Sequence, residues 1–425
     1  MVDVMDRSGD PKVGEPGTKR QQTGSQALLL RTVDPTTSTT MPARNKLLSL
    51  FSSLLAMLNR ILAWLDFVVH YMSNYILYFI FNGLKPQRHT TPSPLKGYAP
   101  SVVVTGASEG IGLATSLYLA TKGYTVFATV PNANEVHKVC DAVSASESAT
   151  HLPPNAIHTL VMDVLSPESI SHCVEEISSR IGSDPQRRLV GVVNNAGYCM
   201  ISPMEATPLS DVRKIFELDF FAYISVIHAF MPIIKKNKGR FVNIGSVGGF
   251  FNPPMWAPYS ALKAAIEGMT RSWRLELMPF GVGMTTIRPG FTRSGGIGGK
   301  IKNALDGYYD GLNGHRDGEK NGTGQVPVGV DSFGRLVKSE MPLGEAEEKV
   351  YRPMLDQWFK SVMVAADGGA QDAEAVAKTV HDAMSDRFLM PYYTVGTSAL
   401  LGQMVRDLCP ESVYEFAVAK TFGCL

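Results

Sequence analysis

The sequence predicts an α/β fold in which helices cover both faces of a doubly wound parallel sheet. From about residue 100 to residue 294, short apolar runs rich in β-branched residues alternate with segments of helical periodicity. Such uninterrupted apolar runs are typical of parallel strands that are buried on both faces. A glycine-rich turn directly follows the first run, where this fold has its first strand-to-helix connection.

Six strands are expected in this region, at residues 101–105, 124–130, 157–162, 189–193, 241–244 and 282–287. Helices fit between them, and periodicity makes three of them clear: residues 110–122, 209–236 and 258–278. Parallel strands need crossover connections, which these helices supply. Two more helices and a strand are expected further along the chain, at residues 346–364, 372–384 and 388–395.

The composition excludes several function classes. The chain has 425 residues, 40 of them basic and 39 acidic, and a formal net charge of +1. A nearly neutral chain gives no electrostatic reason to expect a nucleic-acid partner, and we expect none. The five cysteines lack the spacing of a zinc site, so we expect reduced thiols and no metal: Cys140, Cys173, Cys199, Cys409 and Cys424.

The first 84 residues differ in character from the rest. Residues 1–45 are polar and are expected to form a disordered tail, whereas residues 46–84 are hydrophobic and are interpreted as a membrane anchor. Residues 61–81 are long enough to cross a bilayer as a helix, although Asp66 lies near their start. A hairpin or interfacial helix in one leaflet is an alternative, and so is a soluble helix that packs on the rest of the protein.

The remaining chain is expected to form one folded domain at residues 97–423. Between residues 293 and 342 the pattern of strands and helices gives way to a segment rich in glycine, lysine and aspartate. A stretch of that length without secondary structure is typical of a lid or a disordered loop. We therefore predict a flexible insert at residues 293–342.

The glycine-rich turn reads Thr-Gly-Ala-Ser-Glu-Gly-Ile-Gly at residues 105–112. Glycines permit a tight turn and let a pyrophosphate approach the N-terminus of the next helix, where free N–H groups and the helix dipole favour an anion. The pattern predicts a dinucleotide site and a doubly wound sheet of the Rossmann type. Its expected cofactor-binding residues are Gly106, Ser108, Glu109, Gly110, Ile111 and Gly112.

Two further strand ends extend this site. Asp163 closes the third strand and could accept a hydrogen bond from an adenine amine, although an aspartate there also serves as a turn residue. The fourth strand ends in Asn-Asn-Ala-Gly at residues 194–197, where small residues let the backbone pass beneath the nicotinamide half of a dinucleotide. Asn195, Ala196 and Gly197 are therefore expected to contact the cofactor.

Ser246, Tyr259 and Lys263 form the pattern that carries chemistry. The tyrosine and lysine stand one helical turn apart, and the serine ends a strand thirteen residues before the tyrosine. A phenol has an ordinary pKa of about 10, and a lysine ammonium on the same helix face favours the phenolate. The tyrosine could then transfer a proton while the serine hydroxyl holds the oxygen of an alcohol or a carbonyl.

This ordered set resembles the short-chain dehydrogenase/reductase family. The glycine-rich turn, residues 194–197, Ser246, the Tyr-x-x-x-Lys pair and Pro289-Gly290 occur in that family's order and spacing. The similarity covers about residues 100–294 and 345–423. Residues 243–249, 276–282 and 391–396 resemble the retinol, 17β-hydroxysteroid and 3-hydroxybutyrate dehydrogenase branch, several members of which are membrane-bound.

The resemblance implies roles for the matching positions. Tyr259 would be the acid/base, Lys263 would lower the pKa of the tyrosine and hold the nicotinamide ribose, and Ser246 would bind the substrate oxygen. The resemblance also implies cofactor contacts at Val164, Tyr259, Lys263, Pro289, Gly290 and Thr292.

One position departs from the family's pattern. Asp219 stands where the family has a catalytic asparagine, on the helix after the fourth strand. If that residue acts through its backbone carbonyl, which holds a water beside the lysine, an aspartate can substitute for it. If the side-chain amide matters, a carboxylate near Lys263 would change the proton relay and hold the lysine more firmly charged.

Together these features predict a membrane-associated, NAD(P)-dependent oxidoreductase that interconverts a hydroxyl and a ketone or aldehyde on a steroid, retinoid or related lipid. Glu109 would repel a 2′-phosphate, but no acid ends the second strand, so NAD is favoured over NADP only weakly. We expect the endoplasmic reticulum membrane with the domain facing the cytosol, and a homodimer is compatible with the sequence. The alternative is a non-catalytic dinucleotide-binding scaffold or sensor tethered to a membrane.

Overall fold

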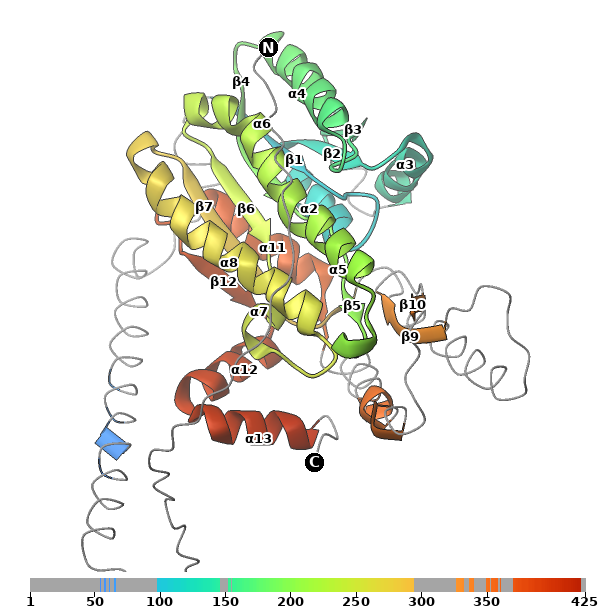
Figure 1. Ribbon diagram of the computed structural model, residues 1–425. Helices are drawn as coiled ribbons and strands as arrows, with labels where there is room; N and C mark the ends of the chain where they lie inside the picture. The colour runs from blue at the N-terminus through green and yellow to red at the C-terminus, as the bar shows by residue number, and fades with distance from the viewer. Residues whose placement is uncertain are drawn as a thin grey trace, which may run out of the picture. The chain divides into compact units, whose positions relative to one another are not determined.

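A seven-stranded sheet forms the centre of the α/β domain, in the order β12-β7-β6-β4-β1-β2-β3 (Figure 1). The computed structural model describes residues 98–145, 152–153, 155–293, 326–331, 336–339 and 370–421, together with the helical residues 54, 57, 58, 61, 65, 349–351, 353–357 and 360. All neighbouring strands of this sheet run parallel, as predicted. The strand order changes direction between β1 and β4, which is where an open α/β sheet binds its ligand.

The strands occupy the places that the apolar runs predict. They are β1 (Ala99–Val104), β2 (Thr125–Val130), β3 (Ile157–Val161), β4 (Arg187–Asn194), β6 (Arg240–Ile244), β7 (Gly283–Pro289) and β12 (Tyr392–Val395). Their side chains alternate between the two faces, so Val102 and Val104 enter one core cluster and Val103 the other. The six predicted strands are confirmed, and the expected strand at 388–395 is a strand over its last four residues only.

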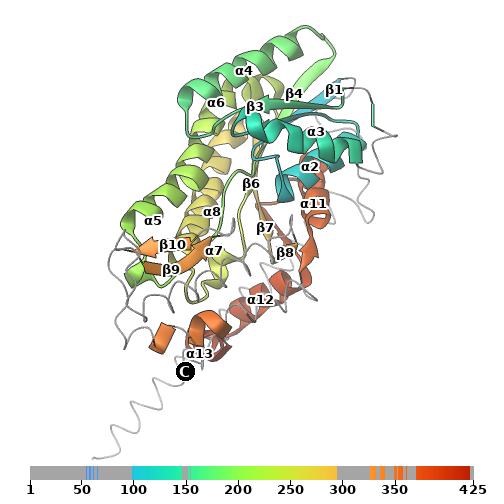
Figure 2. The same cartoon turned by 90° about the vertical axis from the view of Figure 1, so that its right-hand side faces the viewer.

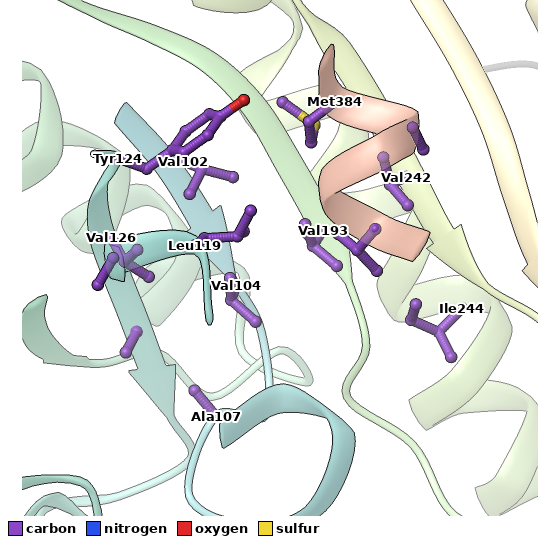
Figure 3. Close-up of a cluster of buried hydrophobic side chains, with 14 of the residues drawn as sticks. Val102, Val104, Ala107, Leu119, Tyr124, Val126, Val193, Val242, Ile244 and Met384 are labelled. Carbon is purple, nitrogen blue, oxygen red and sulfur yellow. The ribbon is translucent and has the colours of Figure 1, made fainter. Parts of the chain in front are cut away.

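Helices α2 (Gly110–Thr121), α3 (Val136–Ala145) and α11 (Ala373–Ser385) cover one face of the sheet. Figure 3 shows part of the core beneath them, where Leu119 of α2 and Met384 of α11 join the valines of β1. The helix α11 follows the insert, so the C-terminal part of the chain completes a core that the first strand begins.

The opposite face is covered by α4 (Pro167–Gly182), α6 (Ala222–Asn237) and α8 (Ala257–Leu277), which completes the three layers seen in Figure 2. Apolar side chains from all three helices enter the second core cluster. Further α-helices are α5 (Leu209–Phe216), α7 (Gly248–Phe251), α12 (Thr397–Leu408) and α13 (Glu411–Thr421).

The helical segment Leu209–Asn237 is the one described helix that is long and apolar enough to cross a membrane, with 29 residues and a mean hydropathy of 1.4. Its side chains Val226, Phe230 and Ile234 are buried against the sheet. We therefore assign it to the core of the domain. The segment is a single helix as predicted, except that Glu217–Phe221 winds as a π-helix between α5 and α6.

Two short strands lie within the segment that the sequence predicts to be a flexible insert. They are β9 (Val326–Asp331) and β10 (Leu336–Ser339), which pair with each other in antiparallel fashion. The strand β9 also pairs with β5 (Met200–Ile201), just after the β4 loop. The sequence analysis did not predict these strands, because Pro327 and Gly329 interrupt the apolar run. The rest of residues 294–342 lies outside the described residues.

A second pairing joins the residues just before the insert to a strand that lies well beyond its end. The strand β8 (Thr292–Arg293) runs parallel to β11 (Gln371–Asp372), so the chain leaves the domain and re-enters it at the same place. An ion pair between Arg293 Nε and Asp372 Oδ1, at 3.0 Å, lies beside this pairing. Both side chains are largely exposed, so the ion pair adds little stability.

Most of the expected membrane anchor, and the whole expected tail at residues 1–45, lie outside the described residues. The described positions of the anchor are helical and exposed: Leu54, Met57, Leu58, Ile61 and Leu65. The expected helix at 346–364 is helical at the positions that are described.

The assignment of Leu209–Asn237 to the core can be tested with two phenylalanines of the same helical segment. Replacing Phe230, which is fully buried, with alanine should lower the free energy of unfolding by about 3 to 5 kcal/mol, since it leaves a cavity. Replacing Phe221, which is 49% exposed, should cost less than about 1 kcal/mol. Urea denaturation of both variants would measure the difference, and equal small losses would contradict a core position for Phe230.

Candidate active site

The glycine-rich turn between β1 and α2 forms a tight cradle. Gly106 and Gly110 adopt positive φ angles of 63° and 61°, which favour glycine. A Cβ atom on Gly106 would lie 2.8 Å from the Cα atom of Ala196, and one on Gly112 would lie 2.2 Å from the carbonyl oxygen of Gly106. The start of α2 also has no side-chain cap, so its first N–H groups suit an anion. The residues of this turn therefore fit the pyrophosphate of a dinucleotide.

Asn195 ties this cradle to the end of β4. Its side-chain amide donates hydrogen bonds to the carbonyl oxygens of Thr105 at 2.9 Å and Gly106 at 3.0 Å. In return, the Thr105 hydroxyl accepts hydrogen bonds from the backbone N–H groups of Asn195 and Ala196. The asparagine that the sequence placed in the cofactor site thus holds the two loops of that site together.

Asp163, at the end of β3, acts as a turn residue in the structure. Its Oδ1 accepts a hydrogen bond from the N–H of Leu165 at 3.0 Å, and its own N–H donates to the hydroxyl of Ser169. The neighbouring Val164 is buried and belongs to the core. Beyond β7, Gly290 donates its N–H to the carbonyl of Val395, and Thr292 begins β8.

Ser246 and Tyr259 meet at the carboxyl edge of the sheet. Ser246 follows β6 and is buried, and its hydroxyl accepts the N–H of Gly248 at 3.0 Å and hydrogen-bonds with Tyr259. Tyr259 lies in the first turn of α8. A Cβ on Gly248 would come within 3.0 Å of the Tyr259 ring, so a glycine is needed where α7 passes this side chain. The serine and tyrosine are therefore brought together as predicted.

Lys263 lies one turn further along α8 and forms a buried ion pair with Asp219. Its Nζ donates to Asp219 Oδ2 at 3.1 Å and to the carbonyl of Ile244 at 3.4 Å, and lies 5.4 Å from the centre of the Tyr259 ring. Asp219 is fully buried in the π-helical segment, and its Oδ1 accepts the N–H of Tyr198 at 3.0 Å. Burial raises the pKa of the Asp219 carboxyl, against the opposing effects of Lys263 and Tyr198.

The pKa of Tyr259 differs in direction from the sequence-based expectation. Burial raises it well above its usual value, negative charge on Cys199 and Asp219 adds to the rise, and the hydrogen bond with Ser246 opposes it. The expectation that the neighbouring lysine lowers this pKa is not met in the structure. The main physical reason is burial of the phenol, and Asp219, which pairs with Lys263, adds negative charge near it.

Three residues near the site were missed by the sequence analysis. Trp256 packs edge-on against Tyr259, with ring centres 5.4 Å apart, and against Phe291. Cys199 lies close enough to affect the pKa of Tyr259. Glu135, five residues after β2, hydrogen-bonds with Ser108 of the glycine-rich turn. Only Trp256 carried a local signal, because it lies one helical turn before the tyrosine.

Comparisons with known proteins place this arrangement in a family. A model of the short chain dehydrogenase family matches residues 100–303. A protein named estradiol 17-beta-dehydrogenase 2 from Mus musculus is 27% identical over 328 residues, which cover 76% of this chain and 74% of that protein. NADPH-dependent 3-dehydrocapnine reductase from Ornithobacterium rhinotracheale is 33% identical over 213 residues, covering 49% of this chain and 70% of that protein.

A crystal structure of a short-chain dehydrogenase from Streptomyces avermitilis shares the fold, with a TM-score of 0.53 and 22% sequence identity. The match covers 77% of this chain and 98% of that one. The family suggested by the ordered motifs is thus confirmed, and so is the likeness to the 17β-hydroxysteroid dehydrogenase branch. The chain belongs to the short-chain dehydrogenase/reductase family, whose members are oxidoreductases.

Proposed function

We propose that this protein is a membrane-associated, NAD-dependent oxidoreductase that interconverts a hydroxyl and a ketone or aldehyde on a lipophilic substrate. The observation that carries the proposal is the meeting of Ser246, Tyr259 and Lys263 at the sheet edge, beside the dinucleotide cradle. A protein that only binds a dinucleotide would not need the hydroxyls of Ser246 and Tyr259 next to each other with Lys263 beside them. We therefore favour an enzyme.

In this mechanism the residues of the chain bind the substrate oxygen and move its proton. The hydroxyls of Ser246 and Tyr259 would both point to the oxygen, and Tyr259 would donate its proton as a carbonyl becomes an alcohol. The reverse reaction returns that proton to the phenolate. The nicotinamide, when bound, supplies or accepts the hydride. Lys263 would contact the nicotinamide ribose.

The substrate class is inferred from the surroundings of Tyr259 and from the relatives. Trp256 is buried, and its ring makes T-shaped contacts with both Tyr259 and Phe291. Aromatic side chains favour the apolar body of a steroid, a retinoid or a related lipid over a small polar substrate. The name of the Mus musculus relative, estradiol 17-beta-dehydrogenase 2, supports a hydroxysteroid as the first compound to test.

A preference for NAD over NADP is supported by Glu135. Its carboxylate hydrogen-bonds with Ser108 in the glycine-rich turn and forms an ion pair with Lys138 at 2.7 Å. An acid at this place can accept hydrogen bonds from the ribose hydroxyls and repels a 2′-phosphate. Glu109 adds a second negative charge at the turn. No acid directly ends the second strand in the sequence, and Glu135 reaches the turn only because the chain folds back in the short helix at Ala133–Glu135.

We further propose that residues 46–84 hold the enzyme at a membrane, with the catalytic domain at residues 97–423 facing the cytosol at the endoplasmic reticulum. The described helical positions from Leu54 to Leu65 support lipid contact, since their side chains are apolar and exposed. A lipophilic substrate would also be concentrated in that membrane. A homodimer and a lid function for the insert at 293–342 are compatible with this arrangement.

The acid/base role predicts the effect of Tyr259→Phe. The variant loses one oxygen and keeps the ring, so turnover should fall by about 10² to 10⁴ while the affinity for NADH persists. Tyr124→Phe is a matched control, because that phenol is also buried and its oxygen has no hydrogen-bond partner among the described residues. Steady-state kinetics with estradiol, other hydroxysteroids and retinol would measure both. Near-full activity in Tyr259→Phe would exclude the mechanism.

The cofactor preference predicts the effect of Glu135→Gln. Losing the charged acceptor should weaken NADH binding by about 10- to 100-fold, since a hydrogen bond to a charged group contributes about 1.5 to 3 kcal/mol. NADPH binding should weaken less or improve. Fluorescence titration of both dinucleotides would measure the ratio, with Glu168→Gln on the exposed start of α4 as control. An unchanged ratio would argue against contact between Glu135 and the ribose.

The membrane proposal predicts the behaviour of the chain in a cell extract. Full-length protein should sediment with membranes and resist extraction by high salt, because its attachment is apolar and salt screens only charge. A chain that begins at Gly97 should stay in the supernatant. Recovery of the full chain in a detergent-free supernatant would favour the soluble-helix alternative.

A further inference from the structure

The Asp219 carboxylate is built into the site from several elements. It is fully buried, and the π-helical segment Glu217–Phe221 carries it to Lys263 and to the backbone of Tyr198. A Cβ atom on Gly197 would lie 2.3 Å from Asp219 Oδ2, so the glycine makes room for the carboxylate. π-helical turns of this kind are frequent at functional sites.

The pair of Asp219 and Lys263 carries no net charge. The lysine ammonium carries one positive charge and the aspartate carboxylate one negative charge. Transfer of a proton from one to the other would leave the sum at zero. A lone lysine ammonium 5.4 Å from the ring of Tyr259 would favour the phenolate. In this chain the carboxylate of Asp219 pairs with that ammonium and opposes its effect, since the charge of Asp219 raises the pKa of Tyr259.

The other described groups that affect Tyr259 do not replace the lost positive charge. Cys199, Asp219 and Tyr223 can each carry only negative charge, and the Ser246 hydroxyl is neutral. The pKa of Tyr259 lies well above its usual value for the reasons given above. Geometry and charge thus agree on a tyrosine that keeps its proton.

We propose that Asp219 is a positioning residue that neutralises Lys263 in place, so that Tyr259 stays a proton donor at neutral pH and the site is poised for carbonyl reduction. This inference rests on the proposed function and adds its preferred direction. In the favoured reaction, hydride from the reduced nicotinamide forms the C–H bond as the carbonyl π bond breaks, and Tyr259 gives its proton to the oxygen. The substrate is reduced and the dinucleotide oxidised. Alcohol oxidation needs the phenolate, so it should require a higher pH.

The first test needs no substrate. The ultraviolet absorbance of phenolate is followed against pH in the purified full chain, and the same titration of Tyr259→Phe is subtracted, which isolates Tyr259. In the unaltered protein Tyr259 should ionise above about pH 10, the ordinary value. In Asp219→Asn, the lone ammonium of Lys263 should lower that midpoint by about 1 to 3 pH units.

Glu267→Gln is the matched control. Glu267 lies one turn beyond Lys263 on α8 and forms a similarly buried ion pair with Arg288. Its loss removes a buried carboxylate from the same helix and leaves Lys263 untouched. The titration midpoint of Tyr259 should therefore not move in this variant, which separates the charge on Lys263 from a general effect on the fold.

The second test uses estradiol and its 17-keto form as probes of the two directions. In Asp219→Asn, the rise of kcat/KM for estradiol oxidation with pH should begin about 1 to 3 pH units lower than in the unaltered protein. Reduction at neutral pH should not gain. A purely structural aspartate would lower the melting temperature without moving the pH profile.

Two results would overturn the inference. One is a Tyr259 that ionises below pH 10 in the unaltered protein, which is measurable even if every Asp219 variant fails to fold. The other is an unchanged Tyr259 midpoint in a folded Asp219→Asn or Asp219→Ala that still binds NADH. Activity retained by Tyr259→Phe would instead overturn the proposed function, and it would leave the titration result standing.

Discussion

Burial of the central sheet on both faces is the constraint on which the rest of the structure depends. Val103, Val192 and Val242, on three neighbouring strands, are completely buried. Backbone groups in such surroundings must bond to neighbouring strands, because an unpaired buried N–H or C=O is costly. The chain can therefore leave the sheet only at strand ends, and the parallel order brings the loops after β1, β4 and β6 to one edge. The candidate catalytic groups lie on the last two of these loops or on the helices that follow them.

Two residues of α8, one helical turn apart, form buried ion pairs that differ in their role. Arg288 pairs with Glu267, and its guanidinium lies 3.6 Å from the centre of the Tyr392 ring, so this pair fastens α8 to β7 and β12. Lys263 pairs with Asp219 inside the candidate catalytic site. Removing two charges from water is costly, and a buried pair often stabilises a fold no more than apolar residues would. The second pair therefore makes better sense through its effect on the charge beside Tyr259 than through stability.

The sequence by itself determined the sheet, its helices and the main catalytic candidates. Strand and helix periods are local properties, so residues 101–105 and 258–278 predicted β1 and α8 to within a few residues. Glycines at 106 and 112 predicted a close approach that a Cβ would block. Ser246 and Tyr259 could be paired from their spacing, because a strand end and the first turn of a helix that soon follows it lie at the same edge of the sheet in this fold.

The tertiary structure alone decided how these parts act on one another. Asp219 and Lys263 are 44 residues apart, and no local pattern showed that the side chains would touch instead of meeting through a backbone carbonyl. The direction of the Tyr259 pKa reversed because desolvation and distant charges set it, and both depend on three-dimensional packing. The pairing of β9 with β5 likewise joins segments that are far apart in the sequence. The contact between Glu135 and Ser108 depends on how the short helix after β2 folds back. Periodicity records which residues are buried, whereas the energy of a charge depends on what lies within a few ångströms of it.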